Sequence, residues 1–262
     1  MGIVNATPDS FSDGGRLATP DQAVEHALQL VAEGAGILDI GGESTRPYSD
    51  PVGRQEELDR VLPVVERLAR ATRVPLSIDT SKAAVARAAI EAGAEIINDV
   101  TGLEGDPEMV DVALETGAGL CAMHMQGTPQ TMQDDPSYTD VVSEILAYLV
   151  ARRDALLERG IEAERICLDP GIGFGKTHAH NLQLVRQVAT FQQTGCPILV
   201  GHSRKGFLGK ILGDKTTDRD LATATMAVSL AEQQVQVIRV HNVKACRQAL
   251  DVWRAIGATI ED

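Results

Sequence analysis

Basic residues are scarce in this sequence. Its 262 residues include 24 Lys and Arg against 37 Asp and Glu, which gives a formal net charge of −13. Such an excess of acid argues against a general surface for nucleic acid or for an anionic membrane. An anionic substrate would therefore have to be met by a local cluster of basic side chains.

Cysteines are also few, and long apolar runs are absent. The four cysteines (Cys121, Cys167, Cys196 and Cys246) lie far apart along the chain and show no paired metal-ligand spacing. We interpret them as reduced structural thiols of an intracellular protein. No stretch approaches the ~20 apolar residues of a membrane span, and no secretory leader is recognisable at the start. We therefore expect a soluble, cytoplasmic protein with no membrane partner.

What the sequence does contain is enough apolar material for a large core. Hydrophobic residues make up 44% of the chain and charged residues 23%, which is typical of globular proteins. A single (β/α)8 barrel usually takes about 250 residues. We therefore expect one domain over residues 1–262 rather than two smaller ones.

Short apolar runs alternate with longer amphipathic ones along the whole chain. This alternation indicates a parallel sheet with crossover helices. The eight predicted strands are Gly2–Asn5, Gly36–Ile40, Leu76–Asp79, Glu95–Asn98, Gly119–Met123, Arg165–Asp169, Pro197–Val200 and Val235–Val240. Eight such units in this length favour a closed (β/α)8 TIM barrel, with an open doubly wound sheet as the alternative.

The predicted strands end on polar residues. These are Asn5, Asp39, Asp79, Asn98, His124, Asp169, Ser203, and Arg239 with His241. Any one of them could simply cap the helix that follows. Because every strand ends this way, and barrel enzymes carry their sites at the carboxyl ends of the strands, the set predicts an active site.

Two long loops follow the first two strands. Residues Thr7–Gly15 are mostly turn formers, and residues Gly41–Pro47 begin with paired glycines that permit a close approach of backbone to a ligand. Either could be an ordinary surface loop. On the catalytic face of a barrel, both are candidate lids that exclude water.

The segment Asp169–Thr177 resembles a phosphate-binding P-loop only in part. Pro170 stands where that motif requires its first glycine, so nucleotide binding is disfavoured. We interpret the glycines as letting the backbone pass close to a flat ligand.

Basic residues follow the last two strands. Arg204 and Lys205 come after the seventh, and Arg239 and His241 after the eighth. Exposed cations are usually solvated, but these two loops are the common phosphate-binding place of the barrel.

Four of the polar residues could form hydrogen bonds along one edge of a flat heterocycle. Two carboxylates, an amide and an ammonium (Asp79, Asp169, Asn98 and Lys205) can pair with a guanidine-like N–C–N edge and a ring carbonyl.

Together these segments resemble the dihydropteroate synthase family. The resemblance runs in order through Asn5 with the Thr7–Gly15 loop, Asp39–Pro47, Ser77–Ser81, Ile97–Val100, Asp169–Lys176, Gly201–Gly206 and Arg239–His241. It covers nearly the whole chain, and the combination is far more specific than any single piece. Departures include Ala6 and Asn242, where the family usually has valine and aspartate, and the start of the chain at its first predicted strand.

The resemblance implies substrates and roles. The dihydropterin would be held by Asp79, Asn98, Met123, Asp169 and Lys205. The pyrophosphate would be held by Asn5, Thr45, Arg239 and His241, with Asn5 also a Mg²⁺ ligand. The 4-aminobenzoate would be held by Thr45, Arg46, Pro47, Phe174, Ser203 and Lys205. The catalytic set would be Asp79, Lys205, Arg239 and His241.

The implied reaction joins (7,8-dihydropterin-6-yl)methyl diphosphate to 4-aminobenzoate in folate biosynthesis. A dissociative course is expected, in which pyrophosphate leaves before the arylamine attacks, so no protein nucleophile is needed. The resemblance also implies a homodimer through helices on the outer face of the barrel.

Three alternatives remain open from the sequence. A pterin-dependent methyltransferase could share Asp79, Asn98 and Asp169 but would not need the basic clusters after the last two strands. A non-catalytic pterin-binding protein would keep the pocket without the chemistry. A third possibility is a synthase that uses another arylamine.

Overall fold

The protein folds as a closed parallel barrel. The computed structural model describes residues 1–7, 19–214 and 216–257. Over these residues, eight strands follow one another: β1 (Gly2–Asn5), β2 (Leu38–Gly41), β3 (Leu76–Asp79), β4 (Ile96–Asp99), β5 (Gly119–Met123), β6 (Ile166–Asp169), β7 (Leu199–Gly201) and β8 (Val237–Arg239). The predicted (β/α)8 architecture is confirmed.

Two narrow seams close the ring of strands. Strands β1 to β6 form one continuous sheet in chain order, and β7 pairs with β8 in a second. A parallel bridge between Leu168 and Ile198 joins β6 to β7, and another between Gly2 and Val240 joins the end of β8 to β1. At the second seam, Ile3 N donates to Val240 O at 3.0 Å. Every strand therefore has two neighbours, and the sheet has no open edge.

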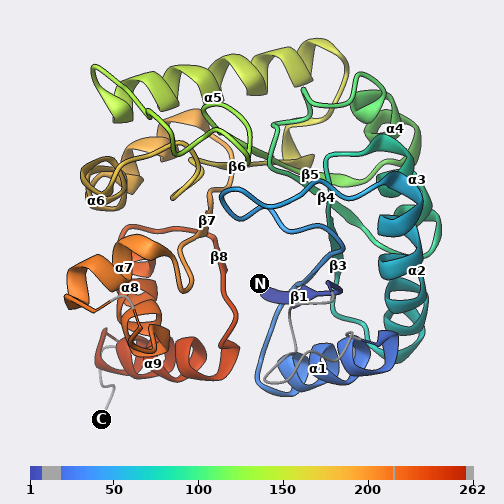
Figure 1. Cartoon of the computed structure of the whole chain (residues 1–262), viewed down its shortest axis with the longest axis horizontal. Coiled ribbons are helices and arrows are strands. Elements are labelled where there is room, and N and C mark those ends of the chain that lie inside the picture. The colour runs from blue at the N-terminus through green and yellow to red at the C-terminus, as the bar shows by residue number, and fades with distance from the viewer. Residues whose placement is uncertain (8–18, 215, 258–262) are drawn as a thin grey trace.

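Helices surround the strands (Figure 1). In the described part of the chain they are α1 (Pro20–Ala32), α2 (Arg54–Ala71), α3 (Ala83–Glu91), α4 (Met109–Thr116), α5 (Val141–Glu158), α6 (His178–Arg186), α7 (Gly206–Leu212), α8 (Asp220–Glu232) and α9 (Val243–Gly257), with the 3₁₀ turns η1 (Ala163–Arg165) and η2 (Val188–Thr194). None of these helices is long and apolar enough to cross a membrane.

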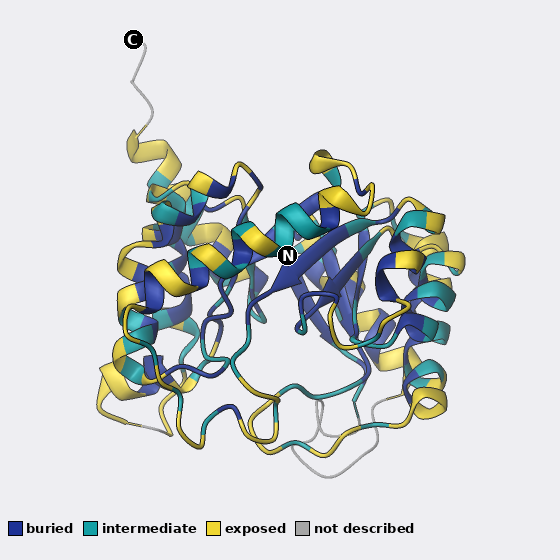
Figure 2. Cartoon of the chain, turned by 90° about the horizontal axis from the view of Figure 1, so that it is seen from above, coloured by how far each residue is buried: buried dark blue, intermediate teal, exposed yellow. Residues whose placement is uncertain are grey.

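The helices bury one apolar face each against the strands. On α2, Val61, Val64, Val65 and Leu68 are fully buried and form one stripe, whereas Leu62 is half-buried. Figure 2 shows the strands buried and the outer helix faces exposed. Burial of each such side chain contributes about 1.5–3 kcal/mol.

Several strands differ from prediction by a few residues at their ends. The ladder of β2 begins at Leu38 and extends to Gly41, whereas Gly36 was the predicted start. Strand β7 begins at Leu199, two residues after the predicted start, because Pro197 has no N–H to donate to a ladder. The Pro197 carbonyl accepts from Leu168 N of β6 at 2.9 Å, and the Ile198 carbonyl accepts from Val237 N of β8 at 3.1 Å. The existence and order of all eight predicted strands are confirmed over the described residues.

Two of the cysteines that are distant in sequence become neighbours in the barrel. Cys121 and Cys167 are register partners on β5 and β6. All four cysteines are free, and the hydrogen bond with the Cys167 thiol together with burial raises the pKa of Cys121. A raised pKa keeps the Cys121 thiol protonated and therefore a poor nucleophile.

Candidate active site

The carboxyl ends of β2, β3, β4 and β8 meet in one buried ionic cluster. Arg239 Nε donates to Asp39 Oδ2 at 2.5 Å, and Arg239 Nη2 donates to Asp79 Oδ2 at 2.6 Å. Asn98 Nδ2 donates to the same Asp39 oxygen at 3.0 Å. Asp39, which the prediction had not assigned to substrate, therefore joins Asn98 to Arg239, and Arg239 in turn joins both to Asp79.

Burial dominates the electrostatics of this cluster. It raises the pKa of Asp79 to about 7, with Asp39 adding to the rise and Arg239 opposing it. For Arg239 burial lowers the pKa, but Asp39 and Asp79 outweigh it and the net shift is upward. The guanidinium therefore stays charged, while Asp79 titrates near neutral pH. Asp39 Oδ1 is buried and has no hydrogen-bond partner among the described residues.

Buried Asp169 and half-buried Lys205 lie together on the same face. Asp169 Oδ1 accepts a hydrogen bond from Gly171 N at 2.7 Å. Lys205 Nζ donates to the Ile172 carbonyl and lies 4.5 Å from the centre of the Phe174 ring. Burial lowers the pKa of Lys205 to about 8, although Asp169 opposes the shift. Met123, the last residue of β5, is the register partner of Asp169 and is buried.

The glycines after β6 serve loop packing. Gly171 and Gly175 have φ of +68° and +63°, and a Cβ there would lie 1.9 Å from His124 O and 2.5 Å from Gln126 O. At Gly173 a Cβ would lie 2.9 Å from the Lys205 side chain. Our interpretation that these glycines approach a flat ligand was therefore wrong for Gly171 and Gly175, which approach the connection after β5.

The lysine of the partial P-loop motif faces inward. Lys176 is 2% exposed, and its Nζ lies 3.0 Å from His124 Nδ1 and donates to Phe174 O at 2.8 Å. Burial lowers its pKa well below the ordinary lysine value. It is unavailable to a nucleotide, in agreement with the sequence argument.

Ser203 and His241 lie together at the ends of β7 and β8. The Ser203 hydroxyl lies 2.9 Å from His241 Nδ1 and accepts from the His241 backbone nitrogen at 3.1 Å. Burial, reinforced by Arg204, Arg239 and Arg46, lowers the pKa of His241 to about 3. We had counted His241 as a cation, and this was wrong: near pH 7 it is a neutral hydrogen-bonding group. Arg204 is paired with Asp220 at 2.6 Å.

The β2 loop (residues 42–53) forms an outer wall of the site. Its predicted substrate residues are less buried than the strand ends: Thr45 is half-buried, and Arg46 and Pro47 are exposed. Of the paired glycines, Gly42 approaches α2, where a Cβ would lie 2.7 Å from Val61, and Gly41 approaches Asp79. The close approach predicted for Gly42 is therefore to a helix.

The connection after β5 (residues 124–140) was missed by sequence reasoning. It contacts the β2 loop, where Tyr48 N donates to Pro129 O at 3.0 Å, and the loop after β6, where Gln133 Nε2 donates to Gly173 O at 2.7 Å. One of these contacts uses the backbone carbonyl of Pro129, and the other uses the side chain of Gln133. Neither residue belongs to a spaced motif that could be recognised in the sequence. Of the first predicted lid, residues 8–15 lie outside the described residues.

The alternative reading of the strand-end acids as helix caps was wrong. The helices that follow Asp39, Asp79 and Asp169 have other N-cap residues, which are Gly53 for α2, Lys82 for α3 and Thr177 for α6. Asp39, Asp79 and Asp169 instead face one another and the basic side chains.

A Mg²⁺ site built by the protein alone does not fit the described residues. No group of three or more His, Cys, Asp or Glu side chains is gathered there to hold a metal. The end of β1 offers the side-chain oxygen of half-buried Asn5. A single oxygen ligand fits a cation that keeps much of its water and binds together with substrate phosphates.

The chain is similar over nearly its whole length to characterised proteins. The family described as "Pterin binding enzyme" matches residues 1–241. The dihydropteroate synthase of Escherichia coli strain K12 is 44% identical over 260 residues, which cover 99% of this chain and 91% of the relative.

Solved structures agree with this likeness. The Xanthomonas albilineans dihydropteroate synthase solved with 4-aminobenzoic acid superposes with a TM-score of 0.92 at 44% identity, covering 99% of this chain and 93% of that one. The same species' dihydropteroate synthase in complex with 7,8-dihydropteroate gives a TM-score of 0.89 at 42% identity, with the same coverage.

Proposed function

The chain belongs to the pterin binding enzyme family and, within it, to the dihydropteroate synthases, and from this premise we propose how its strand ends work. Its function is to condense (7,8-dihydropterin-6-yl)methyl diphosphate with 4-aminobenzoate to 7,8-dihydropteroate and pyrophosphate. It is a transferase of the pterin-methyl group. One barrel domain over residues 1–262 would carry both substrates. The observation that carries the proposal is the shared barrel face of Asp79, Asn98, Asp169 and Lys205.

The dihydropterin would lie across the buried floor of this face. Asp79 and Asp169 offer carboxylates to its N–C–N edge, Asn98 offers an amide, and Lys205 offers a donor to the ring carbonyl. Met123 supplies an apolar contact beside Asp169. Buried partners left unpaired by a wrong ligand are costly, which gives selectivity.

The diphosphate would be met by Asn5, Thr45, Arg239 and His241. Asp39 and Asp79 accept from Nε and from one N–H of Nη2 of Arg239, so Nη1 and the second N–H of Nη2 are the donors that the guanidinium can still present to an anion. His241, neutral near pH 7, would donate a hydrogen bond rather than a charge. Asn5 would hold Mg²⁺ together with the diphosphate, and the metal would neutralise charge on the leaving oxygens.

The reaction breaks a carbon–oxygen bond before it forms the carbon–nitrogen bond. As pyrophosphate departs, positive charge spreads over the pterin and its methylene, and ionised Asp79 stabilises it. The arylamine nitrogen then attacks the methylene and loses a proton. The walls of the site keep water from the cation.

The 4-aminobenzoate would lie between the β2 loop and the loops after β6 and β7. Thr45, Arg46 and Pro47 form one side, and Phe174, Ser203 and Lys205 the other. Phe174 is already held by Lys205, 4.5 Å from its ring centre, which places an apolar surface beside the pterin floor. The Ser203 hydroxyl, shared with His241, would bind the carboxylate.

A cytoplasmic homodimer is part of the proposal. Ile211 and Leu212 on α7 and Leu221 on α8 are exposed, with Leu221 at 80%. These outer helices offer apolar area for a second copy, and the free cysteines suit a reducing compartment.

The direct test uses the purified chain with Mg²⁺, the dihydropterin diphosphate and 4-aminobenzoate. Dihydropteroate is followed by mass, and pyrophosphate release is followed in parallel. Equal, arylamine-dependent formation of both is expected. Pterin binding with neither product would overturn the proposal in favour of a methyltransferase or a non-catalytic binder.

A further inference from the structure

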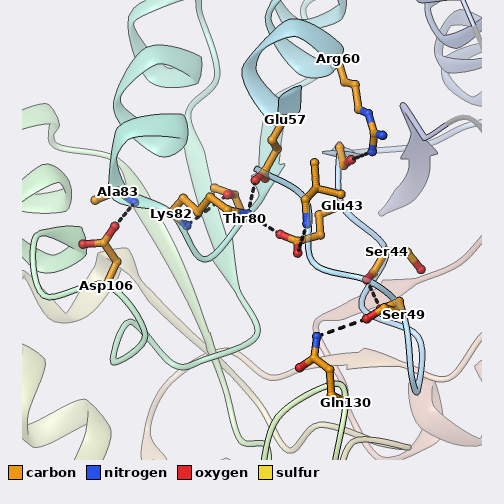
Figure 3. Close-up of polar contacts among 12 residues, drawn as sticks. Glu43, Ser44, Ser49, Glu57, Arg60, Thr80, Lys82, Ala83, Asp106 and Gln130 are labelled. Carbon is orange, nitrogen blue, oxygen red and sulfur yellow. Dashed lines mark hydrogen bonds and ion pairs between the residues drawn. The ribbon is translucent and has the colours of Figure 1, made fainter. Parts of the chain in front are cut away.

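One carboxylate closes the β2 loop at its base. Glu43 Oε1 accepts a hydrogen bond from Val52 N at 3.0 Å, and Glu43 Oε2 pairs with Lys82 Nζ. Residues 44–51 are thereby held as a closed loop, which carries the proposed arylamine residues Thr45, Arg46 and Pro47. Figure 3 shows Glu43 between this loop and the interior.

Lys82 connects that carboxylate to a second, fully buried one. Its Nζ donates to Glu57 Oε2 at 2.6 Å, and Glu57 is 0% exposed, with Oε1 lacking a hydrogen-bond partner among the described residues. Burial lowers the pKa of Lys82, but its hydrogen bonds to Glu43 and Glu57 outweigh burial, and the net shift is upward. The ammonium therefore stays charged. Lys82 lies at the N-terminus of α3, and Glu57 lies in the first turn of α2.

A contribution to folding stability alone does not explain the network of Lys82 with Glu43 and Glu57. A well-packed apolar side chain in place of a buried ion pair is often neutral or stabilising. The network instead joins three elements that must keep register around the site: the β2 loop, α2, and the connection from β3 to α3. Arg60 Nη1 adds a further tie, donating to Gly42 O at 2.7 Å.

Away from its base, the β2 loop is held within itself and by the connection after β5. Ser49 Oγ donates to Ser44 O at 2.5 Å, and Tyr48 N donates to Pro129 O. Two exposed contacts add to these, from Gln130 Nε2 to Ser49 O at 3.2 Å and from Tyr48 OH to Asp134 Oδ1 at 3.1 Å. Asp79 is hydrogen-bonded to Arg239, and the charge of Glu57 reaches it only as a minor cause of its raised pKa. The Lys82 network therefore holds the base of the wall, whereas the floor side chains have other hydrogen-bond partners.

We propose that Lys82, held between Glu43 and buried Glu57, is a positioning residue for the arylamine. It fixes the β2 loop so that Thr45, Arg46 and Pro47 face the second substrate, without touching that substrate. This inference rests on the function proposed above, and it predicts that the network sets the KM for 4-aminobenzoate more than the affinity for the pterin.

The test compares Lys82→Met with the wild-type chain. We expect the KM for 4-aminobenzoate to rise about tenfold to a hundredfold, as for a group misplaced by about 1 Å. The Kd for the dihydropterin diphosphate alone should change by no more than about twofold, because Asp79 and Asp169 are hydrogen-bonded to Arg239 and Gly171 and not to Lys82. Lys82→Arg should restore most of the arylamine KM. The matched control is Arg87→Met on α3, which removes an exposed ion pair with Glu115 of α4.

Amide hydrogen exchange gives a readout that does not depend on turnover. Residues 44–52 should exchange faster in Lys82→Met and in Glu43→Gln, with no change in β3. Glu43 is 23% exposed, so Glu43→Gln carries the test if Lys82→Met does not fold. Unchanged arylamine KM and unchanged exchange in a folded variant would overturn the inference. A wild-type chain that forms no product would instead refute the proposed function, while exchange would still decide whether Lys82 positions the loop.

Discussion

The floor and the wall of the site are built in different ways. The floor consists of strand residues fixed by the register of the barrel (Asp39, Asp79, Asn98, Asp169 and Arg239), together with Lys205 after β7. The wall consists of loop residues whose positions depend on contacts made at the base of the loop, above all by Glu43. We conclude that the floor is preorganised by the backbone and the wall by side chains.

The largest effect should come from the hub of the floor. Asp39→Asn removes the charge that faces Arg239 at a fully buried position, and loss of one partner of such a pair should lower the free energy of unfolding by about 3 kcal/mol. Urea unfolding measures it. Asp251→Asn, in an exposed pair with Arg247, is the control, and a loss no larger than in that control would mean that the floor is not held by charge.

The second largest effect should be on kcat when the floor residue Asp79 loses its charge. Asp79→Asn keeps the shape but removes the negative charge proposed to stabilise the pterin cation, so kcat should fall about 10²- to 10³-fold. Steady-state kinetics with both substrates saturating measures it, with circular dichroism to confirm folding. Near-normal turnover would remove Asp79 from that role.

The base of the wall should be sensitive to a single methyl group. Gly42→Ala would place a Cβ 2.7 Å from Val61 Cγ1, whereas Gly53→Ala, at the other end of the loop, meets nothing within 4 Å. Overpacking at position 42 should cost about 1–3 kcal/mol of unfolding free energy. Thermal unfolding of the two variants tests this. Equal stability would show that the base of the β2 loop can shift to accommodate the added methyl group.

The smallest effect is a pH dependence that separates two floor residues. The pKa of Asp79 is raised to about 7, so its ionised form, and with it kcat/KM for the pterin diphosphate, should fall as pH drops below 7. The pKa of Lys205 is lowered to about 8, so its charged form should be lost above pH 8. The fall on each limb is about tenfold per unit of pH. In Lys205→Arg, only the fall in kcat/KM at high pH should move, and it should move to higher pH. If that fall does not move, the group that titrates there belongs to a substrate and not to Lys205.

The difference between a floor built on strands and a wall built on loops also explains which parts of the structure the sequence could predict. Apolar runs and their polar ends give eight strands and the carboxylates beyond them, because a parallel barrel brings every such end to one face. The pairing of Asp39 with Arg239 is a contact between residues 200 positions apart, and no local pattern marks it. The contacts of the connection after β5 also depend on packing between loops.

The neutral state of His241 was not predictable from its place beside Arg239. It follows from burial and from three surrounding arginines, which only the assembled barrel brings together. The site residues themselves stay predictions, since their substrate contacts await the variants above.

The order in which the floor residues occur along the chain has a consequence for synthesis on the ribosome. The three acids of the floor (Asp39, Asp79 and Asp169) are made before both of its cations, Lys205 and Arg239. A nascent chain therefore carries uncompensated negative charge at the future site until its last strand emerges, when the Arg239 pairs and the bridge from Val240 to Gly2 form together. Pairing of Asp39 and Asp79 with Arg239 and closure of the barrel are thus a single late event, and a chain that stops short of β8 achieves neither.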